Sequence, residues 1–233
     1  MMTFNIHHGE GVDGRIDLER IAAVIRDERA DIVALQEVDK GVERTAGRDL
    51  AEELSRLTGM KALFSNNYGF QGGEYGNALL TRFAVKRWTN THLRMLRAGE
   101  QRGLLQAVLD VLGRDLLVLA THIDHRPDDA ERVQNVGQFK EVLAEYAGLP
   151  ALFGGDFNDT PGSRTHALML EMFDDVWPMA GAGDGFTIPS RGPSKRIDYL
   201  WIRKGSGLKP LKAWVPQTLA SDHLPLVAEF AWL

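Results

Sequence analysis

Short apolar runs of strand length recur along the whole chain, and they constrain its fold more than any other feature. They occupy residues 4–6, 32–35, 78–80, 104–111, 116–120, 151–153, 197–202 and 224–230. Runs of this length that are rich in β-branched and aliphatic residues, bounded by turn-forming residues, are typical of buried strands. We therefore expect a fold built around β-sheet.

Segments with helical periodicity lie between some of these runs. Asp17 and Asp49 are suitable N-caps for two amphipathic helices, of which the second ends at Gly59. A longer helix is predicted after Pro127, with an apolar face that includes Ala130, and a further helix over residues 163–173. Helices and strands are thus both expected.

The order of these elements predicts a layered arrangement. Residues 75–118 carry several strand candidates with no helix between them, so strict β-α alternation is excluded and an α+β or layered α/β/β/α fold is favoured. Residues 181–193 are rich in Gly, Pro and Ser and predict a surface loop. With 233 residues and no linker or change in composition, one domain spanning 1–233 is expected.

Composition excludes several functional classes. The chain has no cysteine, which excludes disulfides, thiol nucleophiles and zinc-thiolate sites. Its net charge of −5 argues against an extended surface that binds duplex nucleic acid, although a local basic cleft stays open. No apolar run approaches the roughly 20 residues of a membrane-spanning helix. As given, the chain is expected in the cytoplasm, unless a leader has been removed from it. A monomer is expected by default.

Polar residues flank most of the apolar runs. Asn5, Glu37, His122 and the pair Asp156 and Asn158 follow the ends of early runs. In the last third of the chain the order is reversed, because the polar residues precede the runs; they are Asp198, Asp222 and His223. If the late strands run antiparallel to the early ones, all these side chains meet at one edge of the fold.

A cluster of buried carboxylates needs a positive charge, because like charges repel strongly in a low dielectric. A divalent cation meets this need. Oxygen ligands from Glu, Asp and Asn, without thiolates, favour a hard ion, Mg²⁺ or Mn²⁺. Since Mg²⁺ keeps several waters and shares phosphate oxygens, this pattern indicates phosphoryl chemistry.

The residues that carry this pattern resemble the endonuclease/exonuclease/phosphatase superfamily, which includes DNase I-like nucleases, abasic-site endonucleases, inositol phosphatases and sphingomyelinases. The matching stretches follow one another in the family's order: residues 3–7 (TFNIH), 35–39 (LQEVD), 76–82 (GNALLTR), 121–122 (TH), 155–158 (GDFN), 196–199 (RIDY) and 221–223 (SDH). The resemblance implies a four-layer α/β/β/α sandwich with two packed mixed sheets. It also implies hydrolysis of a phosphodiester or phosphomonoester by an activated water.

The resemblance assigns roles residue by residue. It implies metal ligands at Glu37, Asn5 and Asp222, the last for the same or a second ion. It implies that Asp156 and Asn158 are the pair that positions and deprotonates the attacking water, and which residue is the general base stays open. It implies that Asp198 is a carboxylate that orients His223, and that His223 contacts a phosphoryl oxygen. It places His122 near the phosphate or the leaving oxygen.

Other residues have two interpretations. His7 shares Asn5's side of an extended strand and is a candidate for binding substrate, as is Arg102, for which a structural ion pair is the alternative. Asp198 could instead pair with Arg196 or Lys195 on the surface. A local positive rim that attracts phosphate, or simply a solvated face, is expected from a set of basic residues: Arg44, Arg48, Arg126, Arg191, Lys195 and Arg196.

Two alternative functions stay open. The first is a zinc hydrolase that uses a cluster of histidines, His7, His8, His122 and His125; it is disfavoured because no His-Glu-x-x-His helix is present and the clustered donors are oxygens. The second is a nuclease of the same family that acts on single-stranded nucleic acid. The substrate is the least constrained feature: a phospholipid headgroup, an inositol phosphate and other small phosphodiesters also fit.

Overall fold

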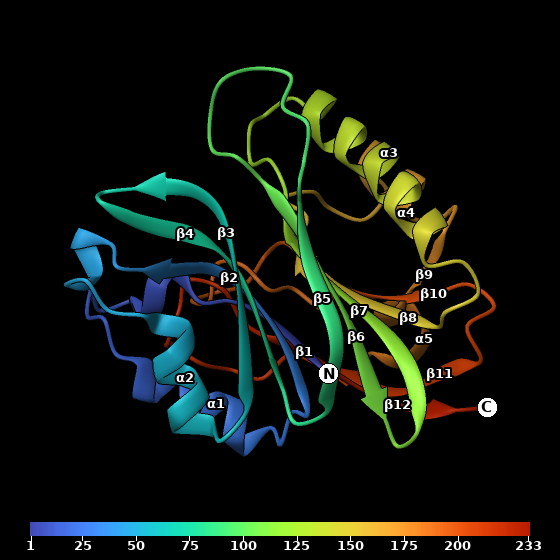
Figure 1. Ribbon diagram of the computed structural model, residues 1–233, viewed down its shortest axis with the longest axis horizontal. Helices are drawn as coiled ribbons and strands as arrows, with labels where there is room; N and C mark the ends of the chain where they lie inside the picture. Colours follow the sequence, from blue (N-terminus) through green and yellow to red (C-terminus); the bar gives the residue numbers. More distant parts are fainter.

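Two six-stranded mixed sheets form the centre of the molecule (Figure 1). The computed structural model describes residues 1–233. The first sheet has the order β11-β12-β1-β2-β4-β3 and the second the order β5-β6-β7-β8-β10-β9. The strands are β1 (Met2–Asn5), β2 (Ile32–Lys40), β3 (Lys61–Phe70), β4 (Gly73–Thr81), β5 (Ala84–His92), β6 (Gly103–Val111), β7 (Arg114–His122), β8 (Ala151–Asp156), β9 (Phe173–Asp175), β10 (Asp198–Arg203), β11 (Leu208–Trp214) and β12 (Leu226–Trp232).

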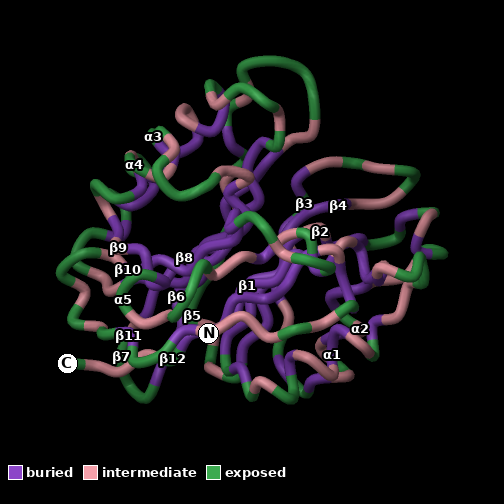
Figure 2. The backbone as a smooth tube through the Cα atoms, turned by 180° about the vertical axis from the view of Figure 1, so that it is seen from behind, coloured by how far each residue is buried: buried purple, intermediate pink, exposed green.

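Helices cover the outer faces of both sheets, so the molecule has the predicted four layers. They are α1 (Leu18–Asp27), α2 (Leu50–Thr58), α3 (Ala130–Glu145), α4 (Arg164–Met169) and α5 (Val176–Ala180), with short 3₁₀ helices η1 (His7–Gly9) and η2 (Glu43–Thr45). One apolar cluster lies between the first sheet and α1 and α2, a second between the two sheets, and a third between the second sheet and α3. The buried backbone in Figure 2 follows the central strands. None of the helices has the length and apolar character that a membrane crossing requires.

The helix starts agree with the sequence in two cases. The side chains of Asp17 and Asp49 accept backbone N–H groups at the starts of α1 and α2, as predicted. The fourth helix is shorter than the expected 163–173, because Phe173 already belongs to β9. In α3 the predicted buried residue Ala130 is exposed. Polar residues of α3, among them Glu131, are buried instead and bond to neighbouring loops.

Strand direction brings the two kinds of polar ends together. β1 runs parallel to β2 and antiparallel to β12, and β10 runs antiparallel to β8. In the β8–β10 pair, Asp198 lies directly opposite Asp156. The prediction that the late strands reverse direction and present their starts at the same edge as the earlier strand ends is therefore confirmed.

Candidate active site

Glu37 occupies a bulge inside β2. The sequence suggested that this strand stops at Glu37, which is wrong: β2 continues to Lys40, with a shift of register against β4 between Leu35 and Val38. Glu37 has a φ of 59°, in the left-handed region that side chains other than glycine seldom adopt. The bulge interrupts the alternation of side chains between the two faces of the strand and so redirects the side chain of Glu37, as bulges beside functional sites often do.

Asn5, at the end of β1, connects two carboxylates. Its Nδ2 donates to Glu37 Oε1 at 2.9 Å and to Asp156 Oδ2 at 3.1 Å. Its Oδ1 accepts the backbone N–H of His7 at 3.1 Å. Asn5 is buried, so its amide holds Glu37 and Asp156 in fixed positions relative to each other.

Asp156 and Asn158 come from the turn after β8. The backbone N–H of Asn158 donates to Asp156 Oδ1 at 2.9 Å, and Asn158 itself has a φ of 48°. Its side chain donates to His122 Nε2 at 2.9 Å and to the carbonyl of Ile123 at 3.1 Å. Gly155 precedes the turn because a Cβ there would lie 2.4 Å from the carbonyl oxygen of Thr121 in the neighbouring strand. The stretch is therefore more than a plain turn.

His223 is fixed by Asp198. Its Nδ1 lies 2.9 Å from Asp198 Oδ2, and its Nε2 lies 3.8 Å from Asp156 Oδ2. All three residues are buried. The alternative that Asp198 pairs with Arg196 on the surface is wrong, because Arg196 instead makes a bidentate pair with Asp175 at 2.9 and 2.7 Å.

The electrostatics of this group are strongly perturbed. Burial and then the carboxylate of Asp198 raise the pKa of Asp156 to about 7, against the opposing effect of His223. Burial alone would lower the pKa of His223, but Asp198, by charge and hydrogen bond, and then Asp156 raise it to about 10. Burial, with Arg102 and His223 nearby, lowers the pKa of His122 well below its usual value. Near neutral pH, His223 is therefore a cation and His122 a neutral imidazole.

A set of hydroxyls and backbone groups, which sequence reasoning missed, positions the late acids. Ser221 Oγ donates to the carbonyl of Asn5 at 2.7 Å and to Asp222 Oδ1 at 3.3 Å. In the loop 181–193, the N–H of Ser190 donates to the carbonyl of Asp222 at 2.7 Å, and Thr187 Oγ1 accepts the N–H of Asp198 at 3.4 Å. Thr187 and Ser190 are buried, so this loop is not purely a surface loop.

A cleft of about 280 Å³ opens over these groups. One side is formed by Tyr68 and Phe70 of β3 and Tyr75 of β4, and the other by the segment that leads into β6. The β3–β4 hairpin and the long β5–β6 connection extend at the same end of the molecule (Figure 1). The cleft lining is Glu37, Arg44, Tyr68, Phe70, Tyr75, Glu100, Arg102, His122, His125, Asp156, Asn158 and His223. The three aromatic residues gave no signal in the sequence.

Two arginines face the cleft, and both have partners. Arg102 is buried and its NH2 lies 2.8 Å from Glu100 and 3.0 Å from His125 Nδ1, while its Nε has no hydrogen-bond partner. The ion pair that was the alternative interpretation of Arg102 is therefore present, and substrate binding by Arg102 stays a prediction. Arg44 makes a bidentate pair with Asp39 and stacks over the ring of Phe70.

Of the other five residues of the predicted positive rim, three are neutralised by salt bridges, whereas Arg191 and Lys195 have no salt-bridge partner. Arg48 pairs with Glu53 and Arg126 with Asp124, in addition to the Arg196 pair described above. The four histidines of the zinc alternative do not form one cluster. His122 is hydrogen-bonded to Asn158 and His125 to Arg102, apart from His7 and His8.

The donor set fits a hard divalent cation. The hydrogen bonds to Glu37 and Asp222 use Oε1 and Oδ1, which leaves the second carboxylate oxygen of each without a protein partner. Both side chains are partly open to solvent. Asn5 contacts Glu37 through its amide nitrogen, and its oxygen accepts the N–H of His7. Carboxylate and amide oxygens are the ligands that Mg²⁺ and Mn²⁺ accept.

Comparison with known proteins agrees with this fold. The sequence model of the Endonuclease/Exonuclease/phosphatase family matches residues 2–223. The chain belongs to this family, whose members hydrolyse phosphoester bonds and generally use a divalent metal.

Three relatives illustrate its range. The uncharacterised protein YbhP of Escherichia coli strain K12 is 29% identical over 245 residues, which cover 98% of this chain and 94% of YbhP. A 5'-tyrosyl-DNA phosphodiesterase of Caenorhabditis briggsae is 28% identical over 68% of this chain and 43% of its own length. The structure of the Bacteroides thetaiotaomicron mannosyl-6-phosphatase Bt3783 superposes with a TM-score of 0.84 at 16% identity, over 99% of this chain and 98% of that one.

Proposed function

We propose that this protein is a phosphoesterase that hydrolyses a small phosphate ester by in-line attack of water, with a divalent ion, Mg²⁺ or Mn²⁺, bound by Glu37, Asn5 and Asp222. One observation carries the proposal: His223 is held by Asp198 at 2.9 Å while its other ring nitrogen faces Asp156 at 3.8 Å on the floor of the cleft. A buried cation and a carboxylate with perturbed pKa values, side by side in a cleft, are the pairing that phosphoryl transfer requires.

Each side chain has a separate role in this proposal. The pKa of Asp156, raised to about 7, suits a group that accepts the proton of the attacking water near neutral pH. His223, positively charged, stabilises the charge that develops on a phosphoryl oxygen. Asn158 orients Asp156 through its N–H and His122 through its side chain. The bound ion supplies Lewis-acid stabilisation of the same developing charge.

The cleft supports a compact substrate. Its volume of about 280 Å³ accommodates a phosphate and one ring, and its arginines are already paired with Glu100 and Asp39, so they add little net positive charge. A sugar phosphate or another phosphomonoester of similar size fits these limits. The structurally similar Bt3783 is a mannosyl-6-phosphatase, which makes a sugar 6-phosphate a natural first substrate to assay.

A second candidate, a nuclease acting on single-stranded ends, is favoured by the aromatic side of the cleft. Tyr68, Phe70 and Tyr75 lie with their rings 5.3 to 6.4 Å apart, and the partly exposed ring of Tyr68 offers a surface on which a base can stack. The 5'-tyrosyl-DNA phosphodiesterase among the relatives acts on nucleic acid, and this makes an oligonucleotide a necessary member of any substrate panel.

The test is a substrate panel with a matched blank. Purified protein is assayed with Mg²⁺, Mn²⁺ or EDTA on p-nitrophenyl phosphate, bis(p-nitrophenyl) phosphate, sugar 6-phosphates and a short single-stranded oligonucleotide, and His223→Ala protein prepared in the same way is the blank. We expect metal-dependent release of phosphate or nitrophenol that the blank lacks. Turnover of the oligonucleotide but of no small ester would favour the nuclease, and no turnover of any substrate above the blank would refute the phosphoesterase.

A further inference from the structure

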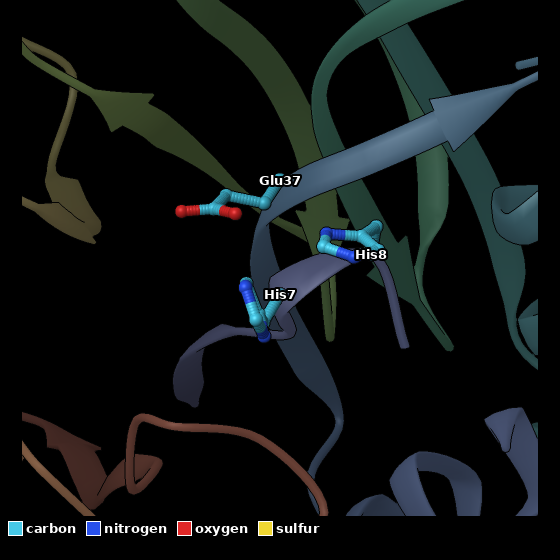
Figure 3. Close-up of side chains that lie close together, drawn as sticks. All are labelled: His7, His8 and Glu37. Carbon is cyan, nitrogen blue, oxygen red and sulfur yellow. The ribbon is translucent and has the colours of Figure 1, made fainter. Parts of the chain in front are cut away.

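His7 and His8 form a second group with Glu37 beside the oxygen donors. The two histidines make up most of η1, the 3₁₀ helix that follows β1. One ligand atom from each of the three residues lies within 4.8 Å of the other two. In Figure 3 the three side chains lie beside one another, with His7 and His8 on η1 and the Glu37 side chain extending from β2 above His7. The three side chains are therefore arranged as a possible set of metal ligands.

The buried imidazole in this group has an unused nitrogen. His8 is only 7% exposed, and its Nδ1 has no hydrogen-bond partner. Its Nε2 lies 3.5 Å from Glu10 Oε2, so Nδ1 is the ring nitrogen that is left without a partner. Buried polar atoms are nearly always paired, so an unpaired imidazole nitrogen beside a carboxylate indicates a ligand that binds there.

The backbone holds both rings on one side. Consecutive residues of an extended chain point in opposite directions. His7 and His8 both have a φ of 45°, and their ring centroids are 4.4 Å apart. With Glu37 at a φ of 59°, all three residues have left-handed backbone, which is strained for side chains other than glycine. Such strain persists where the surrounding structure imposes it, commonly at a ligand site.

The charge around the group favours a cation. Asp222 Oδ1 lies 3.9 Å from His7 Nδ1 and offers a fourth donor on the solvent side. Arg44, the basic residue that faces His8, is paired with Asp39 at 2.8 Å, so the carboxylate of Asp39 offsets part of its charge. Two imidazoles and a carboxylate differ chemically from the all-oxygen set at Asn5, because imidazole nitrogen is preferred by Zn²⁺ and its first-row neighbours and is a poor ligand for Mg²⁺.

We propose that His7, His8 and Glu37 bind a second divalent cation, an imidazole-binding ion such as Zn²⁺ or Mn²⁺, next to the Mg²⁺-type site. Glu37 then serves both sites, as a shared carboxylate does in two-metal centres. The tight spacing of the three donors and the unpaired nitrogen of His8 carry this proposal, which does not depend on the substrate or on turnover.

The test is Zn²⁺ binding measured by calorimetry in excess Mg²⁺, on metal-free protein. Wild type is compared with His7→Ala and His8→Gln, and His92→Ala removes an exposed histidine elsewhere as the matched control. We expect one equivalent of Zn²⁺ in wild type and in the control. Each of the other two variants should lose at least roughly tenfold in affinity, since even an outer partner of a metal ligand costs that much. Substituting Co²⁺ and recording its visible spectrum gives a second, independent reading of nitrogen ligation.

Unchanged Zn²⁺ affinity in either histidine variant would overturn the proposal, as would loss of the Zn²⁺ equivalent in Asn5→Ala with retention in both histidine variants. Circular dichroism verifies that each variant is folded. If His8→Gln does not fold, the result for His7→Ala is decisive, because the His7 side chain is 34% exposed and its removal leaves the core unchanged. Failure of the phosphoesterase proposal would leave these binding results unaffected.

Discussion

Asp198 Oδ2 and His223 Nδ1 lie 2.9 Å apart, although Asp198 begins β10 and His223 precedes β12, a strand of the other sheet. Both are buried, so the pair links the sheets beneath the cleft. The carboxylate fixes the ring and, although burial opposes it, raises the pKa of His223 to about 10. A pair of this kind is expected to act as one unit.

The first prediction is that Asp198→Ala and His223→Ala each cripple turnover and that the double variant is little worse than either. Groups that act together give strongly non-additive losses. The measurement is kcat/KM for wild type, both single variants and the double variant on the best substrate of the panel. Fully multiplicative losses would mean that the two residues work separately, and the role of His223 as a carboxylate-supported phosphate contact would have to be abandoned.

The second prediction concerns Asp156. Asp156→Asn should lose at least roughly a hundredfold in kcat with little change in Tm, the scale expected when one acid-base or preorganising group is removed. The amide still fills the same buried space between Asn5 and Asn158. Asp115→Asn, at an exposed ion pair with Lys86, is the control and should keep full activity. A folded Asp156→Asn protein with near-normal rate would move the water-activating role to another group, with His223 the first to examine.

The third prediction is that activity requires an added divalent ion and that Glu37→Gln raises the concentration needed. Glu37 supplies one of the few protein ligands, and a neutral amide binds a hard cation less strongly than a carboxylate does. Activity is titrated with Mg²⁺ after EDTA treatment, for wild type, Glu37→Gln and the exposed Glu52→Gln control. Full turnover of metal-free protein in EDTA would eliminate the metal from the mechanism.

The sequence predicted the central strands of the fold and missed the edges. Every central strand of both sheets overlaps an apolar run noted in the sequence, and the four missed strands, β3, β5, β9 and β11, are the four edge strands. Edge strands are largely exposed or, like β9, only three residues long, so their composition shows no continuous apolar run. The apolar pattern of a sequence reflects burial, so it does not reveal a strand that is held mainly by backbone hydrogen bonds.

The sequence predicted the part of the site in which polar, chemically reactive residues stand next to strand ends. Asn5, Glu37, Asp156 and His223 lie together because polar residues at strand ends are unusual enough to be noticed. The local geometry was not predictable: the bulge at Glu37 depends on pairing with β4, which is distant in sequence. The aromatic wall was also missed, because Tyr68 and Phe70 reach the cleft only through the length of the β3–β4 hairpin.

The last prediction concerns stability and the buried pair of Asp175 and Arg196. Arg196 NH1 and NH2 lie 2.9 and 2.7 Å from the Asp175 carboxylate, and His166 Nε2 lies 3.0 Å from the same group. Asp175→Asn leaves Arg196 buried without its counter-charge, which should cost about 3–5 kcal/mol and lower Tm by on the order of 10 °C. Glu141→Gln, at the exposed pair with Arg94, is the control and should leave Tm nearly unchanged.

The pH dependence of this loss has a definite sign. Burial alone would raise the pKa of Asp175, but hydrogen bonds from His166 and Arg196 lower it below its usual value. A group whose folded pKa is depressed stabilises the protein above its unfolded pKa, about 3.9 for Asp, and that contribution is lost as the pH falls through the folded pKa. The difference in urea midpoint between wild type and Asp175→Asn should therefore be constant near pH 7 and shrink as the pH falls below about 4. A difference that stays constant down to pH values where wild type unfolds, or that grows on acidification, would mean that ionisation of Asp175 is not the source of this stabilisation.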